Sequence, residues 1–160
     1  RLVNMVLAKV KGEPFESEMT PTTFTPVPMP PAVKDLTRAK LLLITDGGLV
    51  PKGNPDNIEG SAATRWGSYK IDGCDDLKGE DYEISHGGYD PQFVRDDPDR
   101  LVPLDVMREL EQSGAIGELY EEFLSTSGLA NPLSNTRRMG RVMADKAKQL
   151  GIDAVILTST

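Results

Sequence analysis

The sequence is poor in the residues that build metal and redox sites, since it has one cysteine and one histidine. Zinc sites of the Cys and His type need several such ligands around one ion, so this composition excludes them. The single cysteine, Cys74, has no partner for an internal disulfide, which suits a reducing compartment. We therefore expect a cytoplasmic protein without a metal centre.

Net positive charge and long apolar runs are also missing. The formal net charge is -7, whereas a nucleic-acid partner requires a basic face for its phosphates. No apolar run approaches the roughly 20 residues that a membrane span requires. Neither nucleic acid nor a membrane is therefore an expected partner. The 160 residues, of which 38% are hydrophobic, are enough for one globular domain.

Residues 1–36 are expected to form a terminal helix followed by a Pro-rich connector. Apolar residues recur at helical spacing over residues 1–12, and Gly12 is the residue type that best adopts a left-handed C-terminal cap. Six prolines then lie between Pro14 and Pro31. Because proline fixes φ and lacks an amide donor, this segment predicts an extended connector and not a helix or sheet interior.

Residues 37–160 alternate apolar strands with amphipathic helices. This alternation predicts an α/β domain whose mostly parallel sheet has helices on both faces, in a Rossmann-like or flavodoxin-like arrangement. The segments 41–45 and 153–158 are continuous apolar runs, which are typical of central strands buried on both faces. Three helices are expected in this part of the chain. The first begins at Pro103 and ends near Ser113, and the second is a short helix that includes Leu119 and Phe123. The third runs from a cap at Asn135 or Thr136 to Gly151. We expect the chain to be a fragment at both ends and the domain to be incomplete at its C-terminus.

The candidate site lies where strands end, because ligands in open α/β sheets bind beyond the carboxyl ends of the strands. One glycine-rich turn follows segment 41–45, and another follows a short strand that ends near Ile84. Neither contains the GxxxxGK[ST] or GxGxxG pattern, so a nucleotide ligand is not supported. The residues of these two turns are Asp46, Gly47, Gly48, Ser85, His86, Gly87 and Gly88.

Several side chains have both a chemical and a structural interpretation. His86 is a candidate acid–base or carboxylate-binding group, or else it hydrogen-bonds a loop carbonyl. The Arg65 guanidinium can bind a substrate carboxylate while Trp66 covers an apolar or cationic group; alternatively, Trp66 packs and Arg65 pairs with a surface acid. The acidic run from Asp96 to Asp99 resembles a metal cluster, but aspartates are common in turns before helices, so we expect no metal there.

Three long stretches together resemble one protein family. They read TDGGLVPKGNPDNIEGSAATRWGSY, SHGGYDPQFVRDDPDRLVPLDVMRELEQSGAIGELYE and NPLSNTRRMGRVMADKAKQLGIDAVILTST. In order and length they resemble the substrate-specific selenoprotein subunit, component B, of the glycine, sarcosine and betaine reductases. The selenoprotein subunit of D-proline reductase is a more distant likeness. The resemblance covers the chain from Leu2 onward.

The resemblance also implies how the chain ends. In that family the segment that resembles AVILTST is followed directly by selenocysteine, which is encoded by UGA. A host without the matching insertion signal reads that codon as stop. The resemblance therefore implies that this chain ends at Thr160, one residue before its nucleophile, and that the fragment itself is inactive.

The implied chemistry is reductive cleavage of the bond between carbon and nitrogen in glycine or an N-methylated glycine. In the family, the selenolate attacks the α-carbon and the amine leaves. The carboxymethyl group then passes to selenoprotein A and yields acetyl phosphate, with electrons from the thioredoxin system. A companion subunit carries a pyruvoyl group that activates the amine. The fragment is expected to bind no cofactor of its own, and its expected partners are that companion subunit, selenoprotein A and a small amino-acid substrate.

The resemblance suggests roles for the candidate residues. Arg65 would bind the substrate carboxylate, Trp66 would face the amine or methylated ammonium, and His86 would protonate the leaving amine. The two glycine-rich turns would form the rim of the site. The residues that would position the backbone of the nucleophile are Thr158, Ser159 and Thr160.

Two other interpretations stay open at this point. The chain is alternatively a non-catalytic α/β module that binds a small carboxylate or docks companion subunits. An unrelated racemase-like enzyme with paired cysteines is disfavoured, because Cys74 has no second cysteine to pair with. The acidic neighbours of Cys74 would also raise the pKa of its thiol, which disfavours a catalytic role. The sequence does not distinguish glycine, sarcosine and betaine as substrates.

Overall fold

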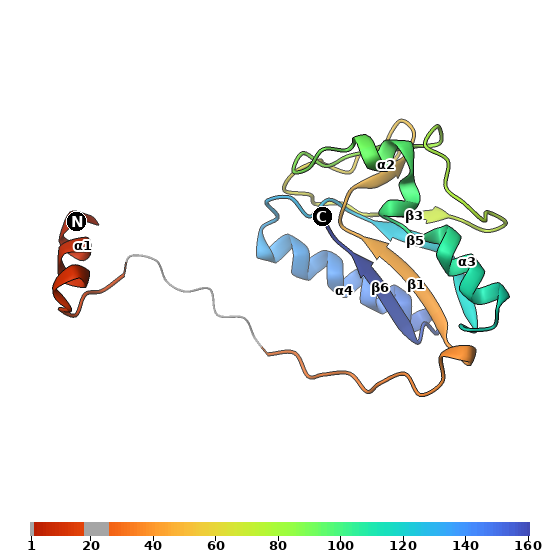
Figure 1. Ribbon diagram of the computed structural model, residues 1–160, viewed down its shortest axis with the longest axis horizontal. Coiled ribbons are helices and arrows are strands. Elements are labelled where there is room, and N and C mark those ends of the chain that lie inside the picture. The colour runs from red at the N-terminus through yellow and green to blue at the C-terminus, as the bar shows by residue number, and fades with distance from the viewer. Residues whose placement is uncertain (1, 18–25) are drawn as a thin grey trace. The chain divides into compact units, whose positions relative to one another are not determined.

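The computed structural model describes residues 2–17 and 26–160 and divides the chain into two compact units, Arg1–Ala32 and Val33–Thr160. In the first unit, helix α1 (Leu2–Lys11) ends at Gly12, whose φ of 72° is left-handed (Figure 1). The prediction of a terminal helix with a glycine cap is therefore confirmed. Residues 13–17 and 26–35 of the connector contain no helix or strand. Its middle part, residues 18–25, lies outside the described residues.

The second unit is built on a four-stranded sheet with the order β3-β5-β1-β6. Strand β1 pairs in parallel with β5 and with β6, whereas β3 pairs antiparallel with β5. The predicted α/β class with a mostly parallel sheet is confirmed, and the Rossmann-like or flavodoxin-like detail stays a prediction. The strands are β1 (Lys40–Thr45), β3 (Gly67–Lys70), β5 (Glu118–Ser125) and β6 (Ala154–Thr158).

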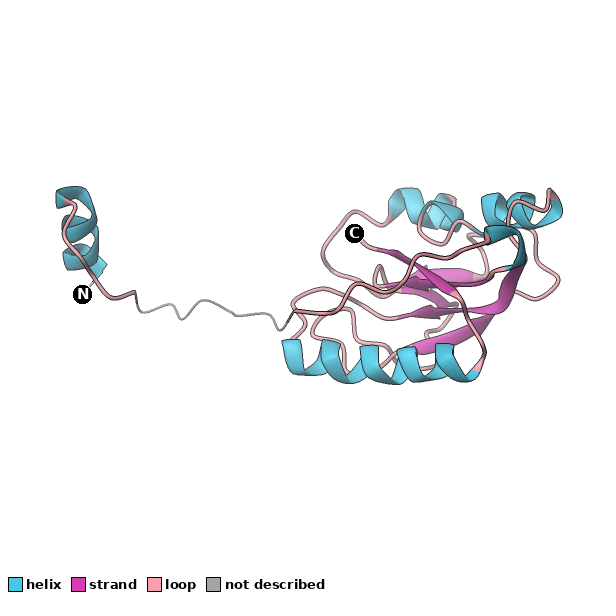
Figure 2. Ribbon diagram, turned by 90° about the horizontal axis from the view of Figure 1, so that it is seen from below, coloured by secondary structure: helices cyan, strands magenta, loops and turns pink. Residues whose placement is uncertain are grey.

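Helices lie on both faces of this sheet, as predicted. Figure 2 shows the long helix α4 (Leu133–Gln149) along one face and shorter helices along the other. The shorter helices are α2 (Gln92–Asp96) and α3 (Leu104–Gln112), and two 3-10 turns cover Leu36–Arg38 and Pro98–Arg100. A second, two-stranded antiparallel sheet follows the carboxyl end of β1. It consists of β2 (Leu49–Pro51) and β4 (Tyr82–Ile84).

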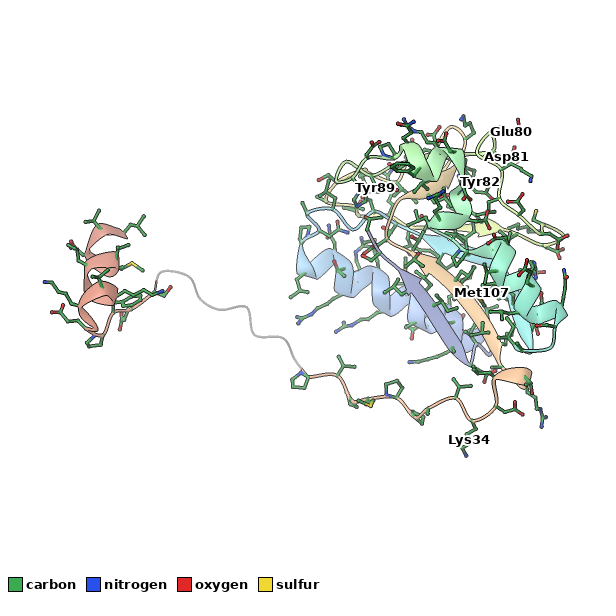
Figure 3. The ribbon with its side chains drawn as sticks, viewed as in Figure 1. Lys34, Glu80, Asp81, Tyr82, Tyr89 and Met107 are labelled. Carbon is green, nitrogen blue, oxygen red and sulfur yellow. The ribbon has the colours of Figure 1, made fainter. Side chains whose placement is uncertain are left out.

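The apolar core is divided by the sheet into two clusters. Leu41 and Leu43 of β1 point to one cluster, together with Met107 of α3 (Figure 3), while Leu42 points to the other, together with Met143 of α4. Successive side chains of a strand alternate between its faces, so a strand that is apolar at every position must be covered on both sides. The prediction for segment 41–45 is therefore confirmed.

The prediction of a short helix around Leu119 and Phe123 is wrong, because these residues belong to strand β5. A spacing of four residues places two side chains on the same face both of a helix and of a strand, so it does not distinguish them. Leu119 pairs with Leu41 and Phe123 pairs with Leu43, with an irregularity between the two pairs. The structure of this segment is determined by its pairing with β1 and β3, two strands that are distant from it in the sequence.

Strand β6 is an edge strand, whereas the sequence predicts a central strand covered on both faces. No strand among the described residues pairs with its outer edge, because its one partner is β1. On the side of α4, Val155 is 44% exposed and Leu157 is 65% exposed. Helix α4 packs on β1 and β5 and leaves these two side chains uncovered.

The predicted cap of helix α4 is also wrong. The helix begins at Leu133, directly after Pro132, and no side chain caps it. The Asn135 side chain donates instead to the Ala63 carbonyl at 3.3 Å, and the Thr136 hydroxyl donates to the Pro132 carbonyl at 3.5 Å. Pro132 precedes the helix with an extended backbone, and its carbonyl accepts the first hydrogen bonds of the helix, from the Asn135 amide at 2.9 Å and the Thr136 amide at 3.2 Å.

Candidate functional site

Three chain segments meet at the carboxyl edge of the sheet, where the sequence predicts a site. They are the turn after β1, the turn after β5 and the residues that follow β6. The Asp46 amide donates to the Thr158 carbonyl at 3.2 Å, and the Gly128 amide donates to the Asp46 carbonyl at 2.7 Å. These bonds continue the strand pairing past the ends of the strands and hold the three segments against one another.

The carboxylate of Asp46 is at the centre of this arrangement. Its Oδ2 accepts a hydrogen bond from the Ser159 hydroxyl at 3.1 Å. A Cβ atom at Gly128 would lie 2.7 Å from the same oxygen, closer than real Cβ atoms approach other atoms. A side chain at position 128 would therefore displace the carboxylate, which lies directly against the backbone of the turn after β5.

Gly48 brings the second glycine-rich turn to the same place. Its amide donates to the Thr126 carbonyl at 2.9 Å, and its carbonyl accepts from the Ser85 amide at 2.8 Å. Its φ is 76°, and a Cβ there would lie 2.2 Å from the Ser85 carbonyl oxygen. Both the left-handed backbone and the close approach require glycine. The turn that contains His86 is fixed to the sheet through this contact.

The side chain of His86 is held by its own turn. Its Nδ1 accepts a hydrogen bond from the Gly88 amide at 3.1 Å, so the proton of the neutral imidazole is on Nε2. The ring contacts Tyr89 at a centroid distance of 5.0 Å. The Tyr89 hydroxyl donates to the Gly47 carbonyl at 2.9 Å, and burial raises the pKa of Tyr89 to about 12. Tyr89 is therefore a neutral donor that links the two glycine-rich turns.

A polar cavity of about 300 Å³ opens between these segments. It brings together five residues that the sequence predicts for the site, and three that it does not. The eight lining residues are Asp46, His86, Gly88, Gly128, Leu129, Ala130, Ser159 and Thr160. The turn after β5 was missed because the preceding strand is predicted as a helix, which hides the carboxyl end that would have marked the turn as part of the site.

A second cavity of about 210 Å³ lies under helix α4 and is mainly apolar. It shares Asp46 and Gly128 with the polar cavity, so these two residues separate the two spaces. Its other lining residues are Ile44, Thr45, Thr126, Asn131, Thr136, Met139, Gly140, Met143 and Leu157. The sequence predicts none of these residues for the site, because the pattern of α4 indicates only an apolar face.

Arg65 and Trp66 line neither cavity. The Arg65 guanidinium is exposed and donates to the Asn57 carbonyl at 3.1 Å. Trp66 is partly buried and packs against the core cluster under α4. The side chains of Arg65 and Trp66 therefore lie in different surroundings. For both to contact one substrate, the Arg65 guanidinium would first have to release the Asn57 carbonyl.

The remaining predicted residues support the two turns by their backbones. The Gly47 amide donates to the Thr45 hydroxyl at 3.1 Å, and the Gly87 amide donates to the Gly60 carbonyl at 3.0 Å. A Cβ at Gly47 would lie 2.6 Å from the Leu101 side chain, so this turn packs tightly on the core. Thr158 contributes its carbonyl, which accepts the bond from the amide of the turn after β1.

The acidic run before α3 is part of the packing of that helix. Asp99 is buried, and its carboxylate accepts from the Leu77 amide at 2.8 Å and from the Asp105 amide at 2.9 Å. In residues 2–17 and 26–160, no group of three or more His, Cys, Asp or Glu side chains could hold a metal ion. No helix in the described part of the chain is long and apolar enough to cross a membrane.

Comparison with known proteins gives one consistent family. A family profile described as glycine/sarcosine/betaine reductase selenoprotein B matches residues 1–160. The whole chain is 47% identical to the glycine reductase complex component B subunit gamma of Carboxydothermus hydrogenoformans. It is 47% and 41% identical to the component B subunits beta of the sarcosine and betaine reductase complexes of Peptoclostridium acidaminophilum. In all three cases the chain spans 37% of the relative's length. No solved structure matches the chain.

Proposed function

Because the chain belongs to the glycine/sarcosine/betaine reductase selenoprotein B family, we propose that it is the substrate-binding part of a component B subunit in a multi-component reductase complex. The observation that carries the proposal is the polar cavity at the carboxyl edge of β1 and β6. It combines the Asp46 carboxylate, the His86 imidazole and the backbone that follows β6. Such edges are where α/β sheets bind small ligands.

The proposed reaction is reductive cleavage of the bond between the α-carbon and nitrogen of glycine, sarcosine or betaine. In the full-length protein a selenocysteine after Thr160 would supply a nucleophile that is ionised at neutral pH, unlike a thiol with a pKa of about 8.5. The residues present fit this group, because Ser159 and Thr160 line the polar cavity and Asp46 holds the Ser159 hydroxyl.

The other members of the complex are part of the same proposal. A companion subunit would provide the pyruvoyl group, and selenoprotein A would accept the carboxymethyl group with electrons from the thioredoxin system. The product that leaves the complex would be acetyl phosphate, and the amine would be released. We place all of these steps in the cytoplasm.

Within this chain the proposed chemical role belongs to His86. The Gly88 amide donates to its Nδ1, so the neutral ring can donate a hydrogen bond to the substrate through Nε2–H. To give a proton to the leaving amine, the ring must first be protonated to the imidazolium, and Nδ1 must then release the Gly88 amide. Asp46 and the two glycine-rich turns form the rim, and Thr158, Ser159 and Thr160 hold the backbone next to the nucleophile. Binding of the substrate carboxylate by Arg65 and contact of the amine with Trp66 stay predictions of the sequence.

The test begins with the nucleotide sequence after the codon for Thr160, where the proposal expects an in-frame UGA and further coding sequence. The full-length selenoprotein is then reconstituted with its companion subunits, and amine release is measured with glycine, sarcosine and betaine. His86→Gln should lower kcat by about 10²–10⁴-fold, the usual contribution of a general acid. Absence of amine release with all three substrates would refute the proposed reaction.

A second proposal, a docking role, is favoured by the exposed side of β6. Val155 and Leu157 are uncovered, and the curated relatives are much longer than this chain. The proposed occupant is the additional part of the full-length family chain. Hydrogen exchange at these two amides should be slower in the full-length protein than in residues 1–160. Equal exchange rates in the two would contradict the docking role.

A further inference from the structure

Among the described residues that line the two cavities, Asp46 is the one with a carboxylate side chain. The titratable side chain that accompanies it is His86 in the polar cavity. No lysine or arginine lines either space. A cavity with an isolated carboxylate attracts the positive end of a ligand and offers no charged partner for its negative end.

One oxygen of Asp46 is available for such a ligand. Oδ2 accepts the bond from the Ser159 hydroxyl, whereas Oδ1 has no hydrogen-bond partner within the described residues. Asp46 and Gly128 line both cavities, so a group bound to the Asp46 carboxylate lies next to both spaces. A cationic nitrogen next to Asp46 would therefore have a polar space on one side and an apolar space on the other.

The apolar side suits carbon groups attached to that nitrogen. Its walls include Ile44, Met139, Met143 and Leu157, and its volume of about 210 Å³ has room for several groups of methyl size. Methionine side chains are polarizable and adapt to irregular shapes, so they pack well around methyl groups. An unsubstituted ammonium ion would gain little from this space, because its N–H donors would find few acceptors there.

We propose that Asp46 binds the cationic nitrogen of the substrate and that the cavity under α4 holds the alkyl groups on this nitrogen. The chain is then suited to N-methylated amino acids, and the size of the apolar cavity determines how much substitution on nitrogen is accepted. This inference rests on the proposed function for the identity of the reaction. The assignment of the cationic end to Asp46 also moves the amine away from Trp66, which lines neither cavity.

The cavity can be filled without disturbing the fold, because Gly140 of α4 lines it and a Cβ at this position would meet no atom within 4 Å. Gly140→Leu places a helix-forming side chain into the empty space. Arg141→Leu is the matched control, since Arg141 is exposed on the same helix and lines neither cavity. Asp46→Asn removes the charge and keeps an oxygen that can accept from the Ser159 hydroxyl.

The first measurement is kcat/KM of the reconstituted full-length complex for glycine, sarcosine and betaine. Gly140→Leu should lower the ratio for N-methylated substrates over glycine by about tenfold or more, the usual effect of methyl-sized changes in an apolar pocket. Arg141→Leu should leave the ratio unchanged. A wild-type complex that acts on glycine alone, or a Gly140→Leu variant that changes all three substrates equally, would overturn the inference and leave the proposed function intact.

The second measurement is calorimetric binding of betaine and of tetramethylammonium to the full-length protein, which needs no turnover. Wild type and Arg141→Leu should bind both compounds, and Asp46→Asn should weaken both by about tenfold or more. If the complex cleaves none of the three substrates but this binding pattern is found, the proposed function fails and the cation site stands. If neither compound binds, or if Asp46→Asn binds them as well as wild type, the cation site is refuted.

Discussion

Gly128→Ala should disturb the site through a single contact. The new Cβ would lie 2.7 Å from Oδ2 of Asp46 and 2.9 Å from its Cγ. The carboxylate must then move by several tenths of an ångström, which lengthens its bond from the Ser159 hydroxyl. Overpacking of this kind costs about 1–3 kcal/mol, and we expect the lower half of that range because Asp46 is partly exposed and can shift toward solvent.

The measurement is the free energy of unfolding in urea for the four proteins of a double-mutant cycle between Gly128→Ala and Asp46→Ala. If the carboxylate is the obstacle, Gly128→Ala should cost little once Asp46 is already alanine, and the coupling free energy should be about 1 kcal/mol. Gly140→Ala is the matched control, since its Cβ enters open space and alanine favours a helix by about 1 kcal/mol over glycine. Additive effects of the two substitutions would refute the proposed contact.

Three further predictions concern individual contacts of the α/β domain. Gly48→Ala should cost about 3 kcal/mol or more in urea unfolding, because its left-handed φ and its contact with a backbone carbonyl cannot both be relieved; a cost below that of Gly128→Ala would contradict this. The hydrogen bonds that the Thr64 hydroxyl and amide donate lower the pKa of Glu59 to about 2. Because the pKa is depressed, the ionised Glu59 stabilises the fold at pH values above its usual pKa of 4.5, and this stability is lost as the pH falls towards 2. Glu59→Gln should remove this part of the pH dependence in thermal melts between pH 7 and pH 2. Arg108→Lys should cost about 1–3 kcal/mol in urea unfolding, because one ammonium cannot replace a guanidinium that donates to two backbone carbonyls and a carboxylate; an unchanged midpoint would show that the lysine suffices.

The sequence predicts β1 well because its burial is encoded locally. Every residue from Leu41 to Leu43 is apolar, and only burial on both faces explains such a run in a short strand. The position of Asp46 in the site follows from the same strand, because the end of β1 is also the edge where ligands bind. The same local pattern therefore predicts both the strand and the position of the proposed site.

The turn after β5 could not be predicted in the same way. The spacing of Leu119 and Phe123 fits both helix and strand, and the pairing with β1 that decides between them joins residues more than 70 positions apart in the sequence. The role of Gly128 depends on that pairing, since only the folded sheet brings it against Asp46. The apolar cavity under α4 likewise depends on how far the helix lies from β6, which no single segment specifies.

The bond between Asp46 and Ser159 joins residues 113 positions apart in the sequence. Contacts of such long sequence separation have a large loop-closure entropy, so they tend to form late in folding. A chain that leaves the ribosome would therefore complete most of its sheet before the residues after β6 can join the site. The nucleophile that the proposed function places after Thr160 would enter the site only after that sheet is in place. This order would limit the time that the nucleophile spends unprotected during synthesis.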